Sequence, residues 1–304
     1  MPAPLDRARS RSYAARLPSR AGLPSHAAPP THPTNSVHIA PTSAHHGRMT
    51  APSHSDRASS FNAAAAQYAA NRPSYPPALF DAIEQLAGRP LTGARVIDVG
   101  AGTGIATDLL HRRGADVLAV EPGEGMAAQF RSAHPDIPIV RGNGNHLPLT
   151  TASADFLTYA QAWHWTDPAH SVPEALRVLR PGGALALWWN TTPLDIAWHA
   201  DQARRIERSF GNHPAVEQNG SGARAALGDP TGKLDFIRRK VRWSRRVPVD
   251  THLANIGSHS IFLVHGTEAS TAFLTEEKQL LLNAFPDGII EETYDVDLLV
   301  ATTP

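Results

Sequence analysis

The chain has 304 residues, its 28 lysines and arginines are balanced by 28 aspartates and glutamates, and 41% of its residues are hydrophobic. A neutral chain without a block of like charges gives no sign of a nucleic-acid groove. The absence of cysteine excludes disulfides and thiolate metal sites. No apolar run approaches the roughly 18 residues of a membrane-spanning helix. We therefore expect a cytoplasmic protein without nucleic-acid partners, membrane partners or a bound metal.

The first segment, residues 1–57, is rich in Pro, Ser, Ala and Arg and has almost no large apolar side chains. Such a segment cannot bury enough surface to offset the entropy of ordering, so we expect a disordered extension. Its arginine-rich beginning resembles a transit peptide. Two alternatives are that Met49 is the true start, which makes residues 1–48 a dispensable leader, or that the segment is a tail with a local role. Residues 58–304 are expected to form the folded domain.

Two helices are expected next, over residues 61–71 and 77–86, with Arg72 and Pro73 ending the first. A β-branched run, Val96–Val99, then predicts a strand, and helical spacing of apolar residues returns from Ile105.

The loop between that strand and helix contains Gly100, Gly102 and Gly104. Glycine at a strand-to-helix loop lets the backbone turn tightly and lets a ligand approach it closely. The sequence therefore predicts a site for a nucleotide-like cofactor.

The loop spacing distinguishes two cofactors. A dinucleotide fingerprint, G-x-G-x-x-G, requires a third glycine at the position of Ile105, and the chain instead reads G-x-G-x-G. Asp98, just before the loop, would repel a pyrophosphate but suits the sulfonium and ammonium groups of S-adenosylmethionine. Glu121 ends the next predicted strand, residues 115–121, where an acid accepts hydrogen bonds from ribose hydroxyls. The alternative for both acids is a solvated strand end.

Seven separated motifs then carry a family resemblance; in order they are AAAAQYAANRPSYP, VIDVGAGTG, VEPGEGM, GNGNHLPL, AQAWHW, RVLRPGG and LWWN. They span nearly all of residues 61–304. The chain resembles the class I methyltransferases that use S-adenosylmethionine, of the type 11-like kind, and most nearly the small-molecule enzymes of the trans-aconitate methyltransferase group. The resemblance implies an α/β Rossmann-like fold with a seven-stranded, mostly parallel sheet flanked by helices, and methyl transfer to a small-molecule acceptor at a carboxylate or hydroxyl oxygen.

The resemblance also implies which residues bind the cofactor. They are Tyr68, Arg72, Asp98, Gly100, Ala101, Gly102, Gly104, Glu121, Pro122, Asn143, Gly144 and Gln161. Arg72 would hold the methionine carboxylate, the alternative being a solvent-facing arginine that ends a helix. Asn143 stands where the family usually has an acid; its carbonyl keeps an acceptor for the adenine amino group.

The acceptor side is expected around WHW, residues 163–165. Strands are predicted over residues 137–141, 154–162 and 184–190, and open α/β sheets bind ligands at the carboxyl ends of their strands. His164 is our candidate catalytic residue, which orients the acceptor or takes its proton. The alternative is a structural imidazole, and for Trp163 and Trp165 we favour wall or core packing.

The last third is expected to complete the sheet. Residues 180–183, RPGG, predict a helix-to-strand turn, and residues 191–236 a helical insertion that caps the acceptor pocket. The remaining strands are predicted over residues 239–249 and 293–302, and helices over 251–263 and 276–285.

Two rival functions stay open. One is a nicotinamide-dependent oxidoreductase on a Rossmann fold, and the other is a catalytically silent protein that binds S-adenosylmethionine. The oligomeric state is expected to be a monomer or a homodimer.

Overall fold

The computed structural model describes residues 71–211, 231–259, 261–262 and 265–304. All of them belong to one unit, Thr50–Pro304. The predictions for Tyr68 and for the N-terminal extension lie outside the described residues, as do residues 61–70 of the helix predicted over 61–71 and residues 212–230 of the predicted insertion.

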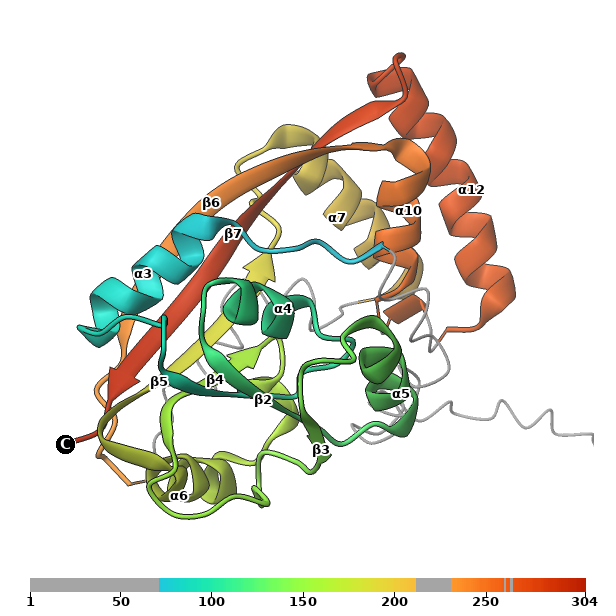
Figure 1. Ribbon diagram of the computed structural model, residues 1–304. Helices are drawn as coiled ribbons and strands as arrows, with labels where there is room; N and C mark the ends of the chain where they lie inside the picture. Colours follow the sequence, from blue (N-terminus) through green and yellow to red (C-terminus); the bar gives the residue numbers. More distant parts are fainter. Residues whose placement is uncertain (1–70, 212–230, 260, 263–264) are drawn as a thin grey trace, which may run out of the picture. The chain divides into compact units, whose positions relative to one another are not determined.

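A seven-stranded sheet forms the centre of this unit (Figure 1). Its strands are β1 Arg95–Val99, β2 Asp116–Glu121, β3 Ile139–Arg141, β4 Ala154–Ala160, β5 Leu179–Thr191, β6 Ile237–Pro248 and β7 Ile289–Thr302. Their spatial order is β3-β2-β1-β4-β5-β7-β6. The first five strands pair in parallel, and β7 runs antiparallel to both β5 and β6. The predicted α/β Rossmann-like fold with a mostly parallel sheet is confirmed.

Both faces of the central strands are buried, which explains why β1 and β4 are almost continuously apolar. One face packs against α3 Pro77–Ala87, α4 Ile105–Arg112 and α5 Glu124–Ala133 in a cluster that includes Phe80, Phe130 and Trp188. The other face packs against α6 Pro168–Val178 in a cluster that includes Leu157 and Val172. The two layers fix the carboxyl ends of the strands at one edge.

A third apolar cluster lies beyond the end of β5. Strands β6 and β7 extend past β5 as a two-stranded ribbon, and the helices α7 Ala197–Phe210, α10 Val249–Gly257 and α12 Thr267–Ala284 gather at its far end (Figure 1). Phe262, Phe273 and Leu281 belong to this cluster. We call these three helices the cap helices. Among the described residues, no helix combines the length and the apolarity needed to cross a membrane.

Several element boundaries differ from the predictions; strand β7, for example, begins at Ile289 rather than at 293. The RPGG segment is part of β5, because Ala154 pairs with Leu179 and Phe156 with Ala184, which leaves the intervening residues as a bulge. Gly182, with φ of 70°, accommodates that bulge. Helix α10 ends at Gly257 rather than at 263, and α12 begins at Thr267 rather than at 276 because its first turns bury Ser270 and Phe273.

Candidate functional site

The glycine-rich loop joins β1 to α4 with all three glycines at positive φ: 70° at Gly100, 59° at Gly102 and 97° at Gly104. A Cβ on Gly100 would lie 2.5 Å from the Cβ of Ala162, and one on Gly104 would lie 2.5 Å from the ring of His134. A Cβ on Gly102 would meet nothing within 4 Å. Two glycines therefore allow close packing, while the third leaves open space in which a ligand can approach the backbone.

Thr103, in the same loop, has a buried hydroxyl without a hydrogen-bond partner within the described chain. Thr103 as a whole is only 4% exposed. An unsatisfied buried hydroxyl is costly, and a ligand with a hydrogen-bonding group removes that cost. The loop therefore fits a polar ligand. Thr103 is not among the predicted site residues although it lies inside the VIDVGAGTG motif.

Asp98 lies beneath the loop rather than at its surface. Its side chain is fully buried, one carboxylate oxygen accepts from Thr107 Oγ1 at 2.6 Å, and the other accepts from Thr158 Oγ1 at 2.8 Å. Burial raises the pKa of Asp98 to about 6. The two threonines each donate to one oxygen of the carboxylate, which thereby ties β1 to α4 and β4. The predicted contact of Asp98 with the cofactor stays a prediction.

Glu121, at the end of β2, lies at the rim of the loop. Its Oε2 accepts from Gly102 N at 2.8 Å, and its Oε1 accepts from Gly123 N at 2.6 Å. Burial raises the pKa of this carboxyl as well. Each carboxylate oxygen can accept a second hydrogen bond, so the arrangement is compatible with the predicted ribose contact.

Ala101 and Pro122 take part in the same junction through their backbones. The amide of Ala101 donates to Val120 O at 3.2 Å, and the carbonyl oxygen of Pro122 accepts from the guanidinium of Arg141. Their predicted contacts with the cofactor stay predictions.

The side chain of Asn143 closes a local turn, and its predicted contact with adenine stays a prediction. Its side-chain oxygen accepts from Asn145 N at 3.0 Å and from His146 N at 3.1 Å, which closes a turn after β3. Both acceptor positions of that oxygen are thereby used, so an adenine amino group would have to displace one of these bonds. Gly144 packs closely, since a Cβ there would lie 3.0 Å from the ring of Tyr159.

Gln161 follows β4 and has a left-handed backbone, with φ of 58°. Its backbone N–H donates to Trp188 O at 2.9 Å. The next residue, Ala162, is the one that a Cβ on Gly100 would overlap. A residue with a side chain is uncommon at positive φ, and such strain concentrates at functional sites. The structure therefore brings Gln161 beside the glycine-rich loop.

His164 lies in a short 3-10 helix, Trp163–Trp165, and its Nδ1 accepts from the indole Nε1 of Trp189 at 3.1 Å. A neutral imidazole that accepts at Nδ1 has its proton on Nε2, which makes Nε2 a donor. Of the two predicted roles, this geometry favours orienting an acceptor over taking its proton. Trp163 is buried edge-on against Tyr159, 4.8 Å between ring centres, so it packs in the core.

The segment that leads into α3 is held across the carboxyl end of β5. Asn190 Nδ2 donates to Ser74 O at 3.3 Å, and Tyr75 packs edge-on against Trp188 with 5.8 Å between ring centres. Arg72 is half-buried and donates to Ser258 O at 3.3 Å, so it is not solvent-facing. Its predicted contact with the methionine carboxylate stays a prediction.

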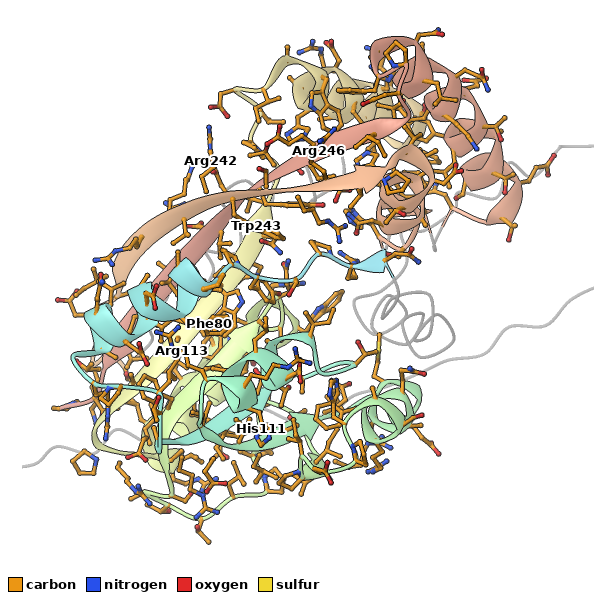
Figure 2. All side chains as sticks on the ribbon, turned by 45° about the horizontal axis from the view of Figure 1, so that its top comes forward. Phe80, His111, Arg113, Arg242, Trp243 and Arg246 are labelled. Atoms are coloured by element: carbon orange, nitrogen blue, oxygen red, sulfur yellow. The ribbon has the colours of Figure 1, made fainter. Side chains whose placement is uncertain are left out.

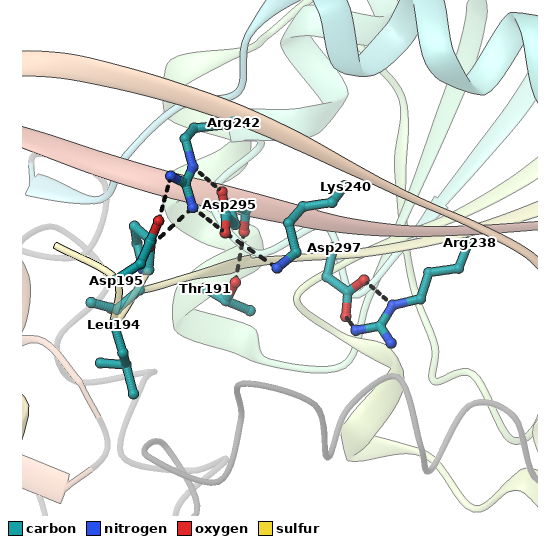
Figure 3. Close-up of a pocket in the computed structure, with 10 residues that line it drawn as sticks. Thr191, Leu194, Asp195, Arg238, Lys240, Arg242, Asp295 and Asp297 are labelled. Carbon is teal, nitrogen blue, oxygen red and sulfur yellow. Dashed lines mark hydrogen bonds and ion pairs between the residues drawn. The ribbon is translucent and has the colours of Figure 1, made fainter. Parts of the chain in front are cut away.

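A separate cavity of about 400 Å³ lies between the end of β5 and the ribbon of β6 and β7 (Figure 3). The charged side chains that line the cavity form ion pairs with one another: Arg238 with Asp297, Lys240 with Asp295, and Arg242 with both Asp195 and Asp295. Those mutual pairs leave little net charge for a ligand. In the part of the chain that the structure describes, no cluster of three or more histidines and acids could hold a metal ion.

The fold and the loop together define a Rossmann-like protein of the methyltransferase type, and comparisons with known proteins agree. Residues 97–187 match the family model described as a methyltransferase domain. The chain is 35% identical over 226 residues to an uncharacterized methyltransferase of Mycobacterium tuberculosis, covering 74% of this chain and 87% of the relative. It is also 34% identical over 172 residues to the malonyl-[acyl-carrier protein] O-methyltransferase of Methylococcus capsulatus, covering 52% and 62%.

A solved structure of a proposed type II methyltransferase from Anaeromyxobacter dehalogenans has the same fold, with a TM-score of 0.52 and 24% identity over 76% of this chain and 96% of that one. The chain belongs to the class I S-adenosylmethionine-dependent methyltransferases. The predicted class of enzyme is thereby confirmed, while the narrower resemblance to the trans-aconitate group stays a prediction.

Proposed function

We propose that this enzyme transfers a methyl group from S-adenosylmethionine to an oxygen of a small-molecule acceptor. The observation that carries the proposal is the glycine-rich loop, with open space at Gly102, the unpartnered hydroxyl of Thr103 and the carboxylate of Glu121 at its rim. This donor and acceptor set suits a ligand with ribose hydroxyls and a polar amino-acid end.

The residues present fit the cofactor as follows. Glu121 would accept from the ribose hydroxyls, Thr103 and Gln161 would hold the methionine end, and Arg72 would bind its carboxylate. When bound, the cofactor supplies an electrophilic methyl group. The side chains supply alignment of the acceptor for an in-line displacement, which requires no nucleophilic residue of the protein.

In this proposal His164 positions the acceptor oxygen by donating from Nε2. An acceptor carboxylate needs no base, so a donor suffices for it. The name of the Methylococcus capsulatus relative, an O-methyltransferase, supports oxygen as the methylated atom. The cytoplasmic location and the monomeric or homodimeric state expected from the sequence stay predictions.

The test is transfer of a tritiated methyl group from S-adenosylmethionine to a panel of small carboxylates, alcohols and amines. We expect turnover with oxygen acceptors, reduced roughly a hundredfold in His164→Ala, where the positioning donor is lost. His164→Gln, which keeps an N–H donor, should retain more activity than His164→Ala. Cofactor binding without any transfer would favour the silent binding protein, and a His164→Ala rate within about twofold of the parent would remove His164 from the site.

A further inference from the structure

The end of strand β5 contacts the 3-10 helix that contains His164. Trp189, near that end, is 3% exposed, and its indole Nε1 donates to His164 Nδ1 at 3.1 Å. Trp165 contacts the same imidazole, with 4.7 Å between ring centres. His164 is only half-buried. The imidazole is therefore held on one side by an indole, while the residue keeps exposed surface.

The 3-10 helix also lies against the glycine-rich loop. A Cβ on Gly100 would lie 2.5 Å from the Cβ of Ala162, which precedes the helix. The carbonyl oxygen of Ala162 accepts from Trp165 N at 3.0 Å and so begins the turn that contains His164. His164 thus follows, two residues later, a residue that touches the loop to which the proposed function assigns the cofactor.

The end of β5 is itself fixed by contacts on other elements. Asn190, next to Trp189, accepts from Trp243 Nε1 at 3.1 Å and donates to Ser74 O at 3.3 Å. Figure 2 shows Trp243 between β6 and the segment that leads into α3. Trp189 therefore stands on a supported strand end, so it can hold the ring of His164 in one orientation.

The contact with Trp189 determines the protonation of His164. An indole N–H can only donate, so Nδ1 must present a lone pair to it, and the proton of the neutral imidazole lies on Nε2. A protonated imidazole would set Nδ1–H against the indole N–H, and a flipped ring would set a C–H group against it. Either change would leave the buried indole donor unsatisfied, which is costly.

Acidic groups on the neighbouring elements are engaged by other partners. Asp167, the acid nearest to His164 along the chain, caps the first turn of α6. Asp297, which pairs with Trp189 across the strands β5 and β7, binds the guanidinium of Arg238 at 2.6 and 2.7 Å. The neutral form of His164 thus follows from its contact with the indole.

We propose that Trp189 is a positioning residue of the methyl-transfer site, which holds His164 as a neutral donor through Nε2 and excludes it from acting as a base. This inference rests on the proposed function, because it concerns His164 at the same site. With Nδ1 occupied by the indole N–H and a proton already on Nε2, neither nitrogen can take a proton from the acceptor. His164 therefore orients the acceptor without exchanging a proton with it.

The experiment observes the imidazole directly in the full chain labelled with 15N-histidine, without cofactor or acceptor. The signals of His164 are assigned by their absence in His164→Gln, and long-range 1H–15N correlation distinguishes protonated from unprotonated ring nitrogens. An ordinary imidazole, with a pKa of about 6.5, would be roughly nine-tenths protonated at pH 5.5. We expect His164 of the parent to remain neutral at that pH, with its proton on Nε2.

Two tryptophan variants separate the indole N–H from general packing. Trp189→Phe removes the N–H and keeps an aromatic ring, so His164 should become protonated at pH 5.5. Trp188→Phe is the matched control, because Trp188 is the adjacent buried tryptophan of β5 and its Nε1 has no hydrogen-bond partner among the described residues. This control should leave His164 neutral, and thermal melting checks that both variants fold.

A double-variant cycle tests whether Trp189 acts through His164. With the panel of small carboxylates, alcohols and amines, we expect methyl transfer by Trp189→Phe to be about tenfold slower than by the parent, as the loss of one hydrogen bond to the ring predicts. The double variant Trp189→Phe with His164→Ala should be within about twofold of His164→Ala, because a positioning residue contributes nothing once its target is removed. A double variant slowed by the product of both effects would contradict the positioning role.

The parent alone can overturn the proposal, even where Trp189→Phe fails to fold. Protonation of its His164 at pH 5.5, or a proton on Nδ1, would do so, as would a His164 that stays neutral in folded Trp189→Phe. Absence of methyl transfer while His164 is neutral with its proton on Nε2 would instead count against the proposed function, so the two failures are distinguishable.

Discussion

Asp98 and Glu121 carry the same charge and have different positions at the loop. Glu121 accepts from the Gly102 amide at the rim, whereas Asp98 is enclosed by Thr107 and Thr158. Burial raises the pKa of both carboxyls, that of Asp98 to about 6. In the free protein, the Asp98 carboxyl beneath the loop is therefore partly protonated in mildly acidic solution. A cationic ligand bound nearby would favour release of that proton.

We predict that the affinity for S-adenosylmethionine rises as the pH is raised from 5 to 7. A nearby cation favours the ionised carboxylate, so binding releases protons while the pH is below the raised pKa and becomes independent of pH well above it. Calorimetry at pH 5, 6 and 7 measures the dissociation constants. S-adenosylhomocysteine, which lacks the sulfonium charge, is the control and should respond less; equal responses of the two ligands would contradict the prediction.

At the level of elements, the cap helices depend on charged groups that are buried among apolar ones. Glu277 on α12 is 1% exposed, and Arg205 on α7 binds both of its oxygens at 2.6 Å, while Gln202 donates to one of them at 3.0 Å. The pair joins α7 to α12 beside the apolar cluster of Phe262, Phe273 and Leu281.

Removing the cation alone should destabilise this part of the protein. Arg205→Met leaves Glu277 buried with a single neutral donor, and we expect the free energy of unfolding to fall by about 3 to 5 kcal/mol. The double variant Arg205→Met with Glu277→Gln should recover much of that loss because no buried charge remains. Urea unfolding measures both; a loss below about 1 kcal/mol in the single variant would show that the pair contributes little.

Elements with a strong local pattern could be predicted from the sequence, and elements decided by distant contacts could not. The apolar runs of β1, β2 and β4 predict buried parallel strands, and the glycines predict the loop after β1. The start of helix α12 was predicted nine residues too late, at 276 instead of Thr267, because its first turns are held by packing against Phe262. The contact of Arg72 with Ser258 O depends on a distant partner that no single stretch of sequence reveals.

At the level of the whole molecule, the strand order explains where a ligand can bind. Strands β2 and β3 lie on one side of β1, whereas β4 and β5 lie on its other side. The connections that follow the neighbouring strands β1 and β4 therefore lead away from each other, toward opposite edges of the sheet. Such a switch point opens a crevice at the carboxyl ends of the strands. Gly102, Gln161 and Asn190 all follow or end strands at that edge, which is why residues far apart in the sequence form one site.

The central claim is that the loop after β1 binds S-adenosylmethionine and not a dinucleotide. Titration calorimetry of the full chain with S-adenosylmethionine and with NAD tests it most directly, with Gly102→Leu as a control that fills the open space at the loop. We predict binding of S-adenosylmethionine by the parent, binding weakened at least about tenfold in Gly102→Leu, and no heat from NAD at the same concentrations. Binding of NAD without binding of S-adenosylmethionine would contradict the claim.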